Sequence, residues 1–316
     1  MAVSQSPQQS NVTSYWAIIV AISTLEAFAG MWINAFLVCV LCIAWVKKKT
    51  LNSNEKILLM LGSSRISSLC LSYLYYCIAR IYPNYFYVYP ILQLFAFFAA
   101  VFNYSNLWVS ACLSGFYCVK IANFRNSFFI YLKVKIDRMV PWLLLGSELL
   151  ALAMAFVFYD INEILLKNIT STSQENFWEV PVRKDKHLFS SFFLIGFGYA
   201  ASFLAVIFSA VFLLFSLWRH KRTMQTSSMK DLSMDAHIRA MKSVLSFLVM
   251  YSINFVCLVL TIIYAMKKEN VMTLLIYIYL YAFPGVHSLT VIFSNPKLEK
   301  ALLKILSCVK WEVFFK

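Results

Sequence analysis

The chain alternates long apolar runs with short polar gaps, and seven of the runs are long enough to cross a membrane. A helix needs roughly 20 apolar residues to span the hydrocarbon core of a bilayer. The pattern therefore predicts an all-α membrane protein, a single heptahelical domain over residues 1–316 built as a seven-transmembrane helix bundle. Pro296 follows the last run, in a short tail over 295–316, and can open a short helix along the membrane surface. The seven runs cover residues 15–46, 56–79, 89–119, 140–159, 188–218, 241–266 and 271–294.

The composition agrees with a membrane protein and argues against a soluble one. Hydrophobic residues make up 61% of the 316 residues and charged residues only 13%, which is about half the charge that a soluble globular protein carries. The net charge of +14 does not indicate nucleic-acid binding, because the basic residues lie in short gaps between apolar runs rather than along one helix or face. We therefore interpret the basic residues as topology signals.

Motifs for catalysis, metal binding or cofactor binding are not found in the sequence. It contains neither an HExxH motif nor a P-loop, and no acidic pair lies inside a run. The eight cysteines lie in or beside apolar runs, and no pair has zinc-ligand spacing. We also find no internal repeat of the kind that secondary transporters show. The sequence therefore predicts neither an enzyme nor a metal or cofactor site.

The distribution of Lys and Arg predicts the orientation, because positively charged loops stay in the cytoplasm. Seven of these residues fall in the gaps of one side, against nineteen in the tail and the gaps 47–56, 120–139 and 219–240. We therefore expect an extracellular N-terminus and a cytoplasmic C-terminus. Two glycosylation sequons, at Asn11 and Asn168, fall on the predicted outside. A third sequon, at Asn103, lies inside a run and is expected to stay unmodified.

Arg65 is an ionisable residue deep inside the second apolar run, in the segment LGSSRISSL. A charge in the middle of a membrane helix costs roughly 2.5–3.5 kcal/mol on insertion scales, so we expect Arg65 to face the bundle interior. Asn34, in the first run, and His287 and Ser288, in the seventh, lie at a similar depth. Amide, hydroxyl and neutral imidazole groups can all accept hydrogen bonds from a guanidinium.

The segment FPGVHS of the seventh run combines these polar residues with a helix breaker. Pro284 leaves a carbonyl one turn earlier unpaired and bends the helix, and Gly285 lets a neighbouring helix approach closely. The sequence thus predicts an intramembrane polar hinge. The alternative is that the helices pack there by chance, with a neutral histidine donating to backbone. The residues of the predicted hinge are Asn34, Arg65, Pro284, His287 and Ser288.

Seven helices with basic cytoplasmic gaps favour a heptahelical receptor, and several segments resemble one family of such receptors. The run LWVSACLSGFYCVKIANF at residues 107–124 resembles the most characteristic segment of the type 2, or bitter, taste receptors, which are G-protein-coupled receptors. Further segments with this resemblance are SRISSL, LWRHKRTM, DLSMDAHIRAMKSVLSFL, FPGVHS and SNPKL, together with the spacing of Glu26, Gly30 and Asn34. Two mild departures are Leu232, where the family often has proline, and Ser294, where it often has glycine.

The resemblance implies a function and a set of site residues. It implies a multi-pass receptor of the plasma membrane that binds bitter small molecules in the extracellular half of the bundle. It also implies activation of a heterotrimeric G protein of the gustducin type, for taste or chemosensory signalling. The implied ligand-binding residues are Tyr76, Ala99, Asn103, Asn254, Tyr277 and Leu280.

The predicted pocket has no obligatory charge, so it should favour neutral, amphipathic molecules. The alternative is that its aromatic residues only pack the helices together and bind no ligand. The candidates for the G-protein face are Tyr117, Lys120, His220 and His237. Lys120 and the basic gaps could equally serve topology and contacts with anionic membrane lipids.

Two other functions remain open from the residues alone. A pheromone-type vomeronasal receptor would keep the fold but should lack the pairing of FYCVKIANF with FPGVHS. A transporter or channel would need a continuous polar pathway, and apart from Arg65 the central runs show little such lining.

Overall fold

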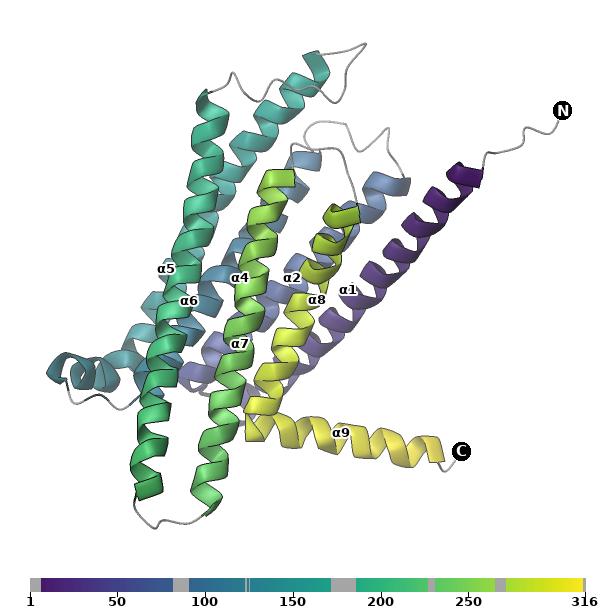
Figure 1. Ribbon diagram of the computed structural model, residues 1–316. Helices are drawn as coiled ribbons and strands as arrows, with labels where there is room; N and C mark the ends of the chain where they lie inside the picture. Colours follow the sequence, from purple (N-terminus) through teal and green to yellow (C-terminus); the bar gives the residue numbers. More distant parts are fainter. Residues whose placement is uncertain are drawn as a thin grey trace.

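The computed structural model describes residues 7–81, 91–122, 124, 126–171, 186–226, 231–264 and 271–314. These residues form eight helices: α1 (Pro7–Lys48), α2 (Ser53–Ile81), α4 (Ile91–Ile121), α5 (Ser127–Ser171), α6 (Lys186–Thr226), α7 (Asp231–Tyr264), α8 (Val271–Ser294) and α9 (Pro296–Phe314). Seven of them, α1, α2 and α4 to α8, are long and apolar enough to cross a membrane (Figure 1). The prediction of a seven-helix membrane bundle is thereby confirmed.

Several helix ends follow from local sequence signals. The backbone N–H of Asn52 donates to Oε2 of Glu55 at 2.9 Å, which is half of a capping box at the start of α2. Pro296 is the first residue of α9, where a missing N–H costs nothing. Asn295, the residue before it, accepts from the backbone N–H of Lys297 at 3.1 Å. The predicted helix after Pro296 therefore exists, and it is 19 residues long.

The fourth span is the clearest difference between the predicted and observed bounds. The sequence predicts a span over 140–159, whereas α5 runs from Ser127 to Ser171 and contains Pro141. The apolar pattern finds only the part of a helix that lies in hydrocarbon, and Lys, Arg and Asp continue the helix beyond it. Asn126 starts the helix by accepting from the backbone N–H of Phe128 at 2.9 Å.

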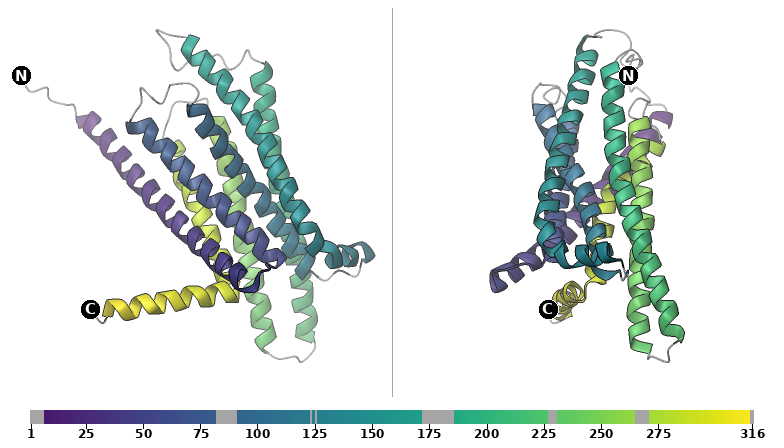
Figure 2. Two further views of the ribbon diagram at one scale, coloured as in Figure 1. Left: turned by 180° about the vertical axis from the view of Figure 1, so that it is seen from behind. Right: turned by 90° about the vertical axis from the view of Figure 1, so that its left-hand side faces the viewer.

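The seven spans form a closed ring in which each helix packs against the next. In ring order they are α1, α2, α4, α5, α6, α7 and α8, and α8 packs against α1. Helix α4 also contacts α6 and thus lies closest to the centre. Helix α9 leaves the lower end of α8 and runs roughly perpendicular to the bundle (Figures 1 and 2). We refer to this end of the bundle as the α9 end.

Large apolar side chains lie on the outside of the ring and polar ones inside, as expected for a protein in lipid. The side chain of Trp32 is 76% exposed, whereas Arg65 and Ser288 are 0% exposed. In water, both the exposed apolar side chains and the buried polar ones would be unfavourable. Packing of small and apolar groups fills the space around the buried polar residues. The membrane thus accounts for the exposed apolar surface, and the buried polar groups need partners inside the bundle.

Candidate functional site in the bundle interior

Arg65 lies at the centre of the polar interior and holds residues of two other helices. Its Nε donates to Oδ1 of Asn106 on α4 at 2.9 Å. Its Nη1 donates to Oγ of Ser288 on α8 at 2.6 Å, and its Nη2 contacts Nδ1 of the neighbouring His287. A guanidinium only donates, so Nδ1 of His287 accepts and the ring proton lies on Nε2. One side chain of α2 thus binds α4 and α8 together.

Ser288 extends this arrangement to the first helix. Its Oγ accepts from Arg65 and donates to Oδ1 of Asn34 at 2.6 Å. The amide Nδ2 of Asn34 donates in turn to the backbone carbonyl of Gly30 at 2.8 Å. Because all these groups are buried, each bond offsets a desolvation penalty of about 1–3 kcal/mol. We call Asn34, Arg65, Asn106, His287 and Ser288 the polar cluster; it joins α1, α2, α4 and α8.

An aromatic layer connects the polar cluster to α7. The ring of His287 lies 4.7 Å from that of Phe247 and 5.7 Å from that of Phe283, measured between centroids. Tyr251 contacts the same two phenylalanines, at 5.6 and 6.1 Å, and its hydroxyl donates to the carbonyl of Leu107 at 3.3 Å. We call Phe247, Tyr251 and Phe283 the aromatic layer. A shift of α7 therefore acts on His287 through direct ring contacts.

The backbones of α1 and α8 touch at a pair of glycines beside the polar cluster. A Cβ added at Gly285 would lie only 3.1 Å from the Cα of Gly30. Pro284, the preceding residue, lies inside α8 and has no N–H for the carbonyl of Leu280. This part of α8 thus combines a missing helix bond with close contact to α1. It is a place where α8 can bend without breaking further hydrogen bonds.

The structure brings together four of the five residues of the predicted hinge through direct hydrogen bonds, and Pro284 lies next to them. The sequence reasoning missed Asn106, which accepts from Arg65. Asn106 lies three residues after Asn103, on the same face of α4, and at a depth comparable with Arg65. A comparison of the depths of polar residues along the spans could therefore have identified it. The arrangement is observed, whereas movement at this point stays a prediction.

The predicted ligand-binding residues lie beyond the polar cluster, on the side away from the α9 end. Ala99 and Asn103 share a face of α4 with Asn106, because they precede it by seven and three residues. Leu280 precedes His287 by seven residues on one face of α8, and Tyr277 precedes it by ten, about 80° further round the helix. Tyr277 is 46% exposed and lies six residues after the first residue of α8.

On α7, Asn254 follows Tyr251 by three residues and is buried. The side chain of Tyr76 lies outside the described residues. The described members of the predicted pocket thus lie on α4, α7 and α8, the helices that the polar cluster and the aromatic layer connect.

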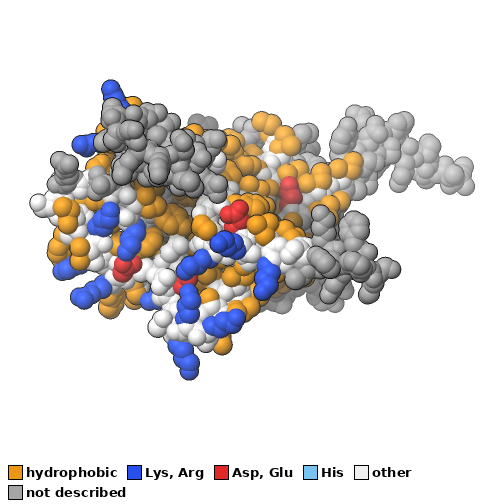
Figure 3. All heavy atoms as spheres, turned by 90° about the horizontal axis from the view of Figure 1, so that it is seen from below, with side chains coloured by type: hydrophobic (Ala, Val, Ile, Leu, Met, Phe, Trp, Pro, Cys, Tyr) orange, Lys and Arg blue, Asp and Glu red, His pale blue; other side chains and the backbone are white. Residues whose placement is uncertain are grey.

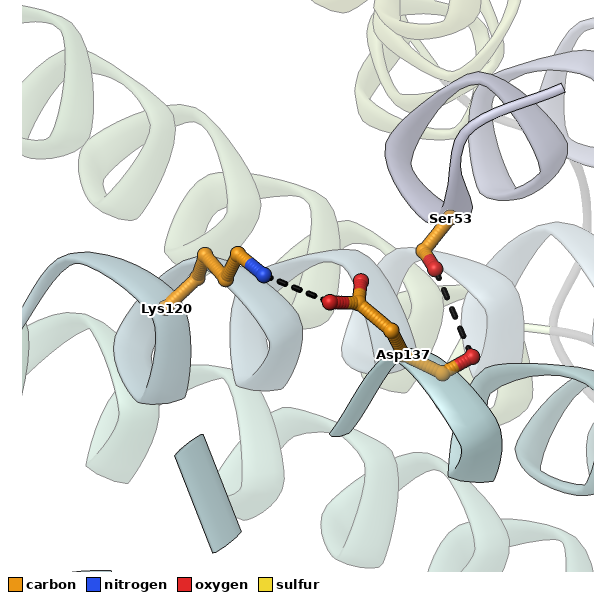
Figure 4. Close-up of polar contacts among 3 residues, drawn as sticks. All are labelled: Ser53, Lys120 and Asp137. Carbon is orange, nitrogen blue, oxygen red and sulfur yellow. Dashed lines mark hydrogen bonds and ion pairs between the residues drawn. The ribbon is translucent and has the colours of Figure 1, made fainter. Parts of the chain in front are cut away.

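At the α9 end, Lys120 is engaged within the protein. Its Nζ forms an ion pair with Oδ2 of Asp137 on α5 at 2.6 Å. The hydroxyl of Ser53, at the start of α2, donates to the backbone carbonyl of Asp137 at 3.4 Å (Figure 4). Tyr117, one turn earlier on α4, is half-buried and packs against apolar clusters. The contact of Lys120 with Asp137 therefore ties the end of α4 to α5.

The α9 end also carries many Lys and Arg side chains and few acidic ones over its described part (Figure 3). The side chains of His220 and His237, the other two candidates for the G-protein face, lie outside the described residues. The same holds for the sequon side chains of Asn11 and Asn168. Among the described residues, no group of His, Cys, Asp and Glu could hold a metal ion.

Seven apolar helices closed around a buried polar cluster define a heptahelical membrane protein of the receptor type. Comparison with known proteins identifies the family. A family model described as "Taste receptor protein (TAS2R)" matches residues 12–310. The chain therefore belongs to the type 2 taste receptor family, as its sequence segments indicate.

Individual relatives match over nearly their whole length. Taste receptor type 2 member 7 of Macaca mulatta is 32% identical over 286 residues, which cover 89% of this chain and 90% of the relative. Taste receptor type 2 member 9 of Papio hamadryas is 34% identical over 301 residues, which cover 93% of this chain and 94% of the relative. These matches do not favour the vomeronasal or transporter alternatives, and the family is one of receptors rather than enzymes.

Proposed function

We propose that this bitter taste receptor binds neutral, amphipathic small molecules in the extracellular half of its bundle and activates a heterotrimeric G protein, of the gustducin type, at its cytoplasmic face. Membership of the type 2 taste receptor family supports a G-protein-coupled receptor for small-molecule agonists. The placement of the polar cluster between the predicted pocket and the α9 end is the observation that carries the proposal. We further propose that the receptor acts as one domain in the plasma membrane, with its N-terminus outside.

The predicted pocket suits neutral ligands because its polar groups carry no charge. Asn103 and Asn254 offer both a donor and an acceptor, and Tyr277 offers an apolar face and a hydroxyl. Ala99 and Leu280 add apolar surface without polar atoms. A ligand with one flat apolar part and one or two uncharged polar groups matches this set. An ionic ligand would lose its hydration without gaining a counter-charge from these residues.

The polar cluster gives the pocket a short route to the rest of the bundle. Asn103 lies about 4.5 Å along α4 from Asn106, and Leu280 lies about 10 Å along α8 from His287. A ligand shifts a receptor only if it binds one conformation better than another. We infer that agonists bind better to a conformation in which α7 and α8 are displaced relative to α4. The polar cluster and the aromatic layer would then pass this displacement to the α9 end.

At the cytoplasmic face, the proposal gives Lys120 a role that depends on its partner. Lys120 is paired with Asp137, so contact with a second protein would compete with this pair. The two side chains are 45% and 50% exposed, so the pair is weak in water and opens at small cost. We infer that G-protein contact at Lys120 accompanies separation of this pair. The same basic surface also suits contact with anionic lipids.

Dose responses of pocket variants test the proposed binding site. We expect Asn103→Ala and Tyr277→Ala to lower agonist potency by about tenfold each, which corresponds to about 1.4 kcal/mol of lost binding. The assay measures calcium release in cells that carry a taste-type G-protein chimera, with a panel of bitter compounds. Tyr131→Ala, at an exposed tyrosine near the start of α5, serves as the matched control. Unchanged potency in both pocket variants at equal surface expression would remove the pocket.

A further inference from the structure

The buried charge of Arg65 has no counter-charge among the described residues. Arg65 is 0% exposed, and its three partners, Asn106, His287 and Ser288, are neutral acceptors. The ion pairs that the structure describes join Lys120 to Asp137 and Lys297 to Glu55, at the α9 end. A buried charge is normally paired, because an unpaired one pays its full desolvation cost.

The acidic residues inside the described spans do not neutralise this charge. Glu148 accepts from Oγ of Ser105 at 2.6 Å, at the contact of α4 and α5. Glu26 lies eight residues before Asn34, about 12 Å along α1, and the Gly30 contact with α8 comes between them. One carboxylate oxygen of Glu26 is buried without a hydrogen-bond partner among the described residues. The polar cluster thus carries an uncompensated positive charge.

Donor groups are also left over beside this charge. Each terminal nitrogen of Arg65 carries two N–H groups and makes one hydrogen bond in the described structure, so one N–H on each remains. Ser110 lies on the Arg65-binding face of α4, four residues and about 6 Å after Asn106. Its hydroxyl is fully buried and has no partner among the described residues. The hydroxyl of Ser110, unpartnered among the described residues, therefore lies one helical turn along α4 from Asn106, the residue that accepts from Arg65.

We propose that a small monovalent anion, chloride, binds inside the bundle between α2 and α4. A remaining N–H group of Arg65 and the hydroxyl of Ser110 donate to it. A chloride ion supplies the missing negative charge, which a water molecule in the same place does not. Chloride is also compact, and it does not take up a proton at any physiological pH. Both properties suit a site deep among helices. Anion occupancy then stabilises the polar cluster.

Thermal unfolding of the full-length receptor tests this site. The receptor is reconstituted in uncharged phosphatidylcholine nanodiscs, and sodium chloride is exchanged for sodium gluconate at constant ionic strength. A ligand that binds only the folded state raises its stability, so we expect a melting temperature about 2 °C or more higher in chloride. Sodium sulfate at the same ionic strength is the second comparison. Equal melting in all three salts, or an equal rise in chloride and sulfate, overturns the proposal.

Three variants locate the effect within the bundle. Ser110→Ala removes a donor that has no other partner, and we expect the chloride effect to disappear. Ser114→Ala is the matched control, because Ser114 is a buried serine one turn further whose hydroxyl donates to the carbonyl of Val206 at 3.4 Å. It should keep the chloride effect. Asn106→Asp places a carboxylate where Oδ1 now accepts from Arg65 at 2.9 Å, so it supplies an internal counter-charge.

The third variant gives the sharpest outcome. We expect Asn106→Asp to melt higher than the unmodified receptor in gluconate and to gain less than about 1 °C on adding chloride. A full chloride effect in Asn106→Asp, or in Ser110→Ala, overturns the assignment of the anion to Arg65 and Ser110. Loss of the effect in Ser114→Ala as well as in Ser110→Ala does the same, since it indicates a general weakening of α4. These melting experiments involve no agonist or G protein, so they are independent of the proposed pocket.

Discussion

The contact between Gly30 and Gly285 leads to a quantitative prediction for a single methyl group. In Gly285→Ala the new Cβ would lie 3.1 Å from Cα and 3.6 Å from N of Gly30. These are backbone atoms, so the contact cannot be relieved by rotation of a side chain, and α1 and α8 must separate by a few tenths of an ångström. Overpacking of this kind costs about 1–3 kcal/mol.

The separation also acts on the polar cluster. His287 and Ser288 lie two and three residues after Gly285, and the bond from Ser288 to Asn34 is only 2.6 Å long. Moving α8 away from α1 lengthens this bond. We therefore expect Gly285→Ala to lower agonist-stimulated signalling as well as stability.

Thermal melting of the purified receptor in nanodiscs measures the loss of stability in Gly285→Ala. One kcal/mol corresponds to about 2–4 °C in domains of 150–250 residues, so we expect Gly285→Ala to melt at least about 2 °C lower. Gly196→Ala is the control, since a Cβ there meets nothing within 4 Å. Gly30→Ala should cost less than Gly285→Ala, because its closest contact, at 2.9 Å, is the flexible end of Leu69. A Gly285→Ala receptor that melts as high as the control would refute the close-contact argument.

Two further predictions concern the two ends of the bundle. Asp137→Asn breaks the exposed pair with Lys120, and we expect it to reduce stability by less than about 1 kcal/mol. We also expect it to raise agonist-stimulated G-protein activation. A loss of activation would show that the pair itself is needed. Asn168→Gln should remove a glycan from the extracellular side, seen as faster gel migration that matches glycosidase-treated receptor. Asn103→Gln should leave the migration unchanged, and a shift there would place that sequon outside the membrane.

The number and order of the spans could be predicted because hydropathy responds to the bilayer itself. The last span illustrates this: the apolar run over 271–294 coincides with α8 (Val271–Ser294). The run over 140–159 underestimates the length of α5 (Ser127–Ser171), because Lys133, Lys135 and Asp137 can continue a helix beyond the hydrocarbon core. Hydropathy identifies where a helix crosses lipid, and it contains no information on how far the helix continues in water.

The interior could be predicted only in part, because a sequence gives the depth of a residue more readily than its direction. The charge of Arg65 and its depth pointed to partners on the first and seventh spans. Arg65 bonds to His287 and Ser288 of the seventh span, as expected, whereas Asn34 of the first span bonds to Ser288 rather than to Arg65. Asn106 was missed because an asparagine in a membrane helix has several possible partners. The same holds for the bond from Ser105 to Glu148, which depends on the rotation of α5 against α4.

Agonist-stimulated G-protein activation in Ser288→Ala, compared with Thr290→Ala at matched surface expression, tests most directly whether the polar cluster transmits the signal. Ser288→Ala removes an acceptor of Arg65 and a donor to Asn34. The hydroxyl of Thr290, on the same helix, donates to the backbone carbonyl of Val286 instead. A bond to a charged group contributes about 1.5–3 kcal/mol, so we expect at least about tenfold lower potency in Ser288→Ala and unchanged potency in Thr290→Ala. Equal potency in the two variants would contradict a role for the polar cluster in signalling.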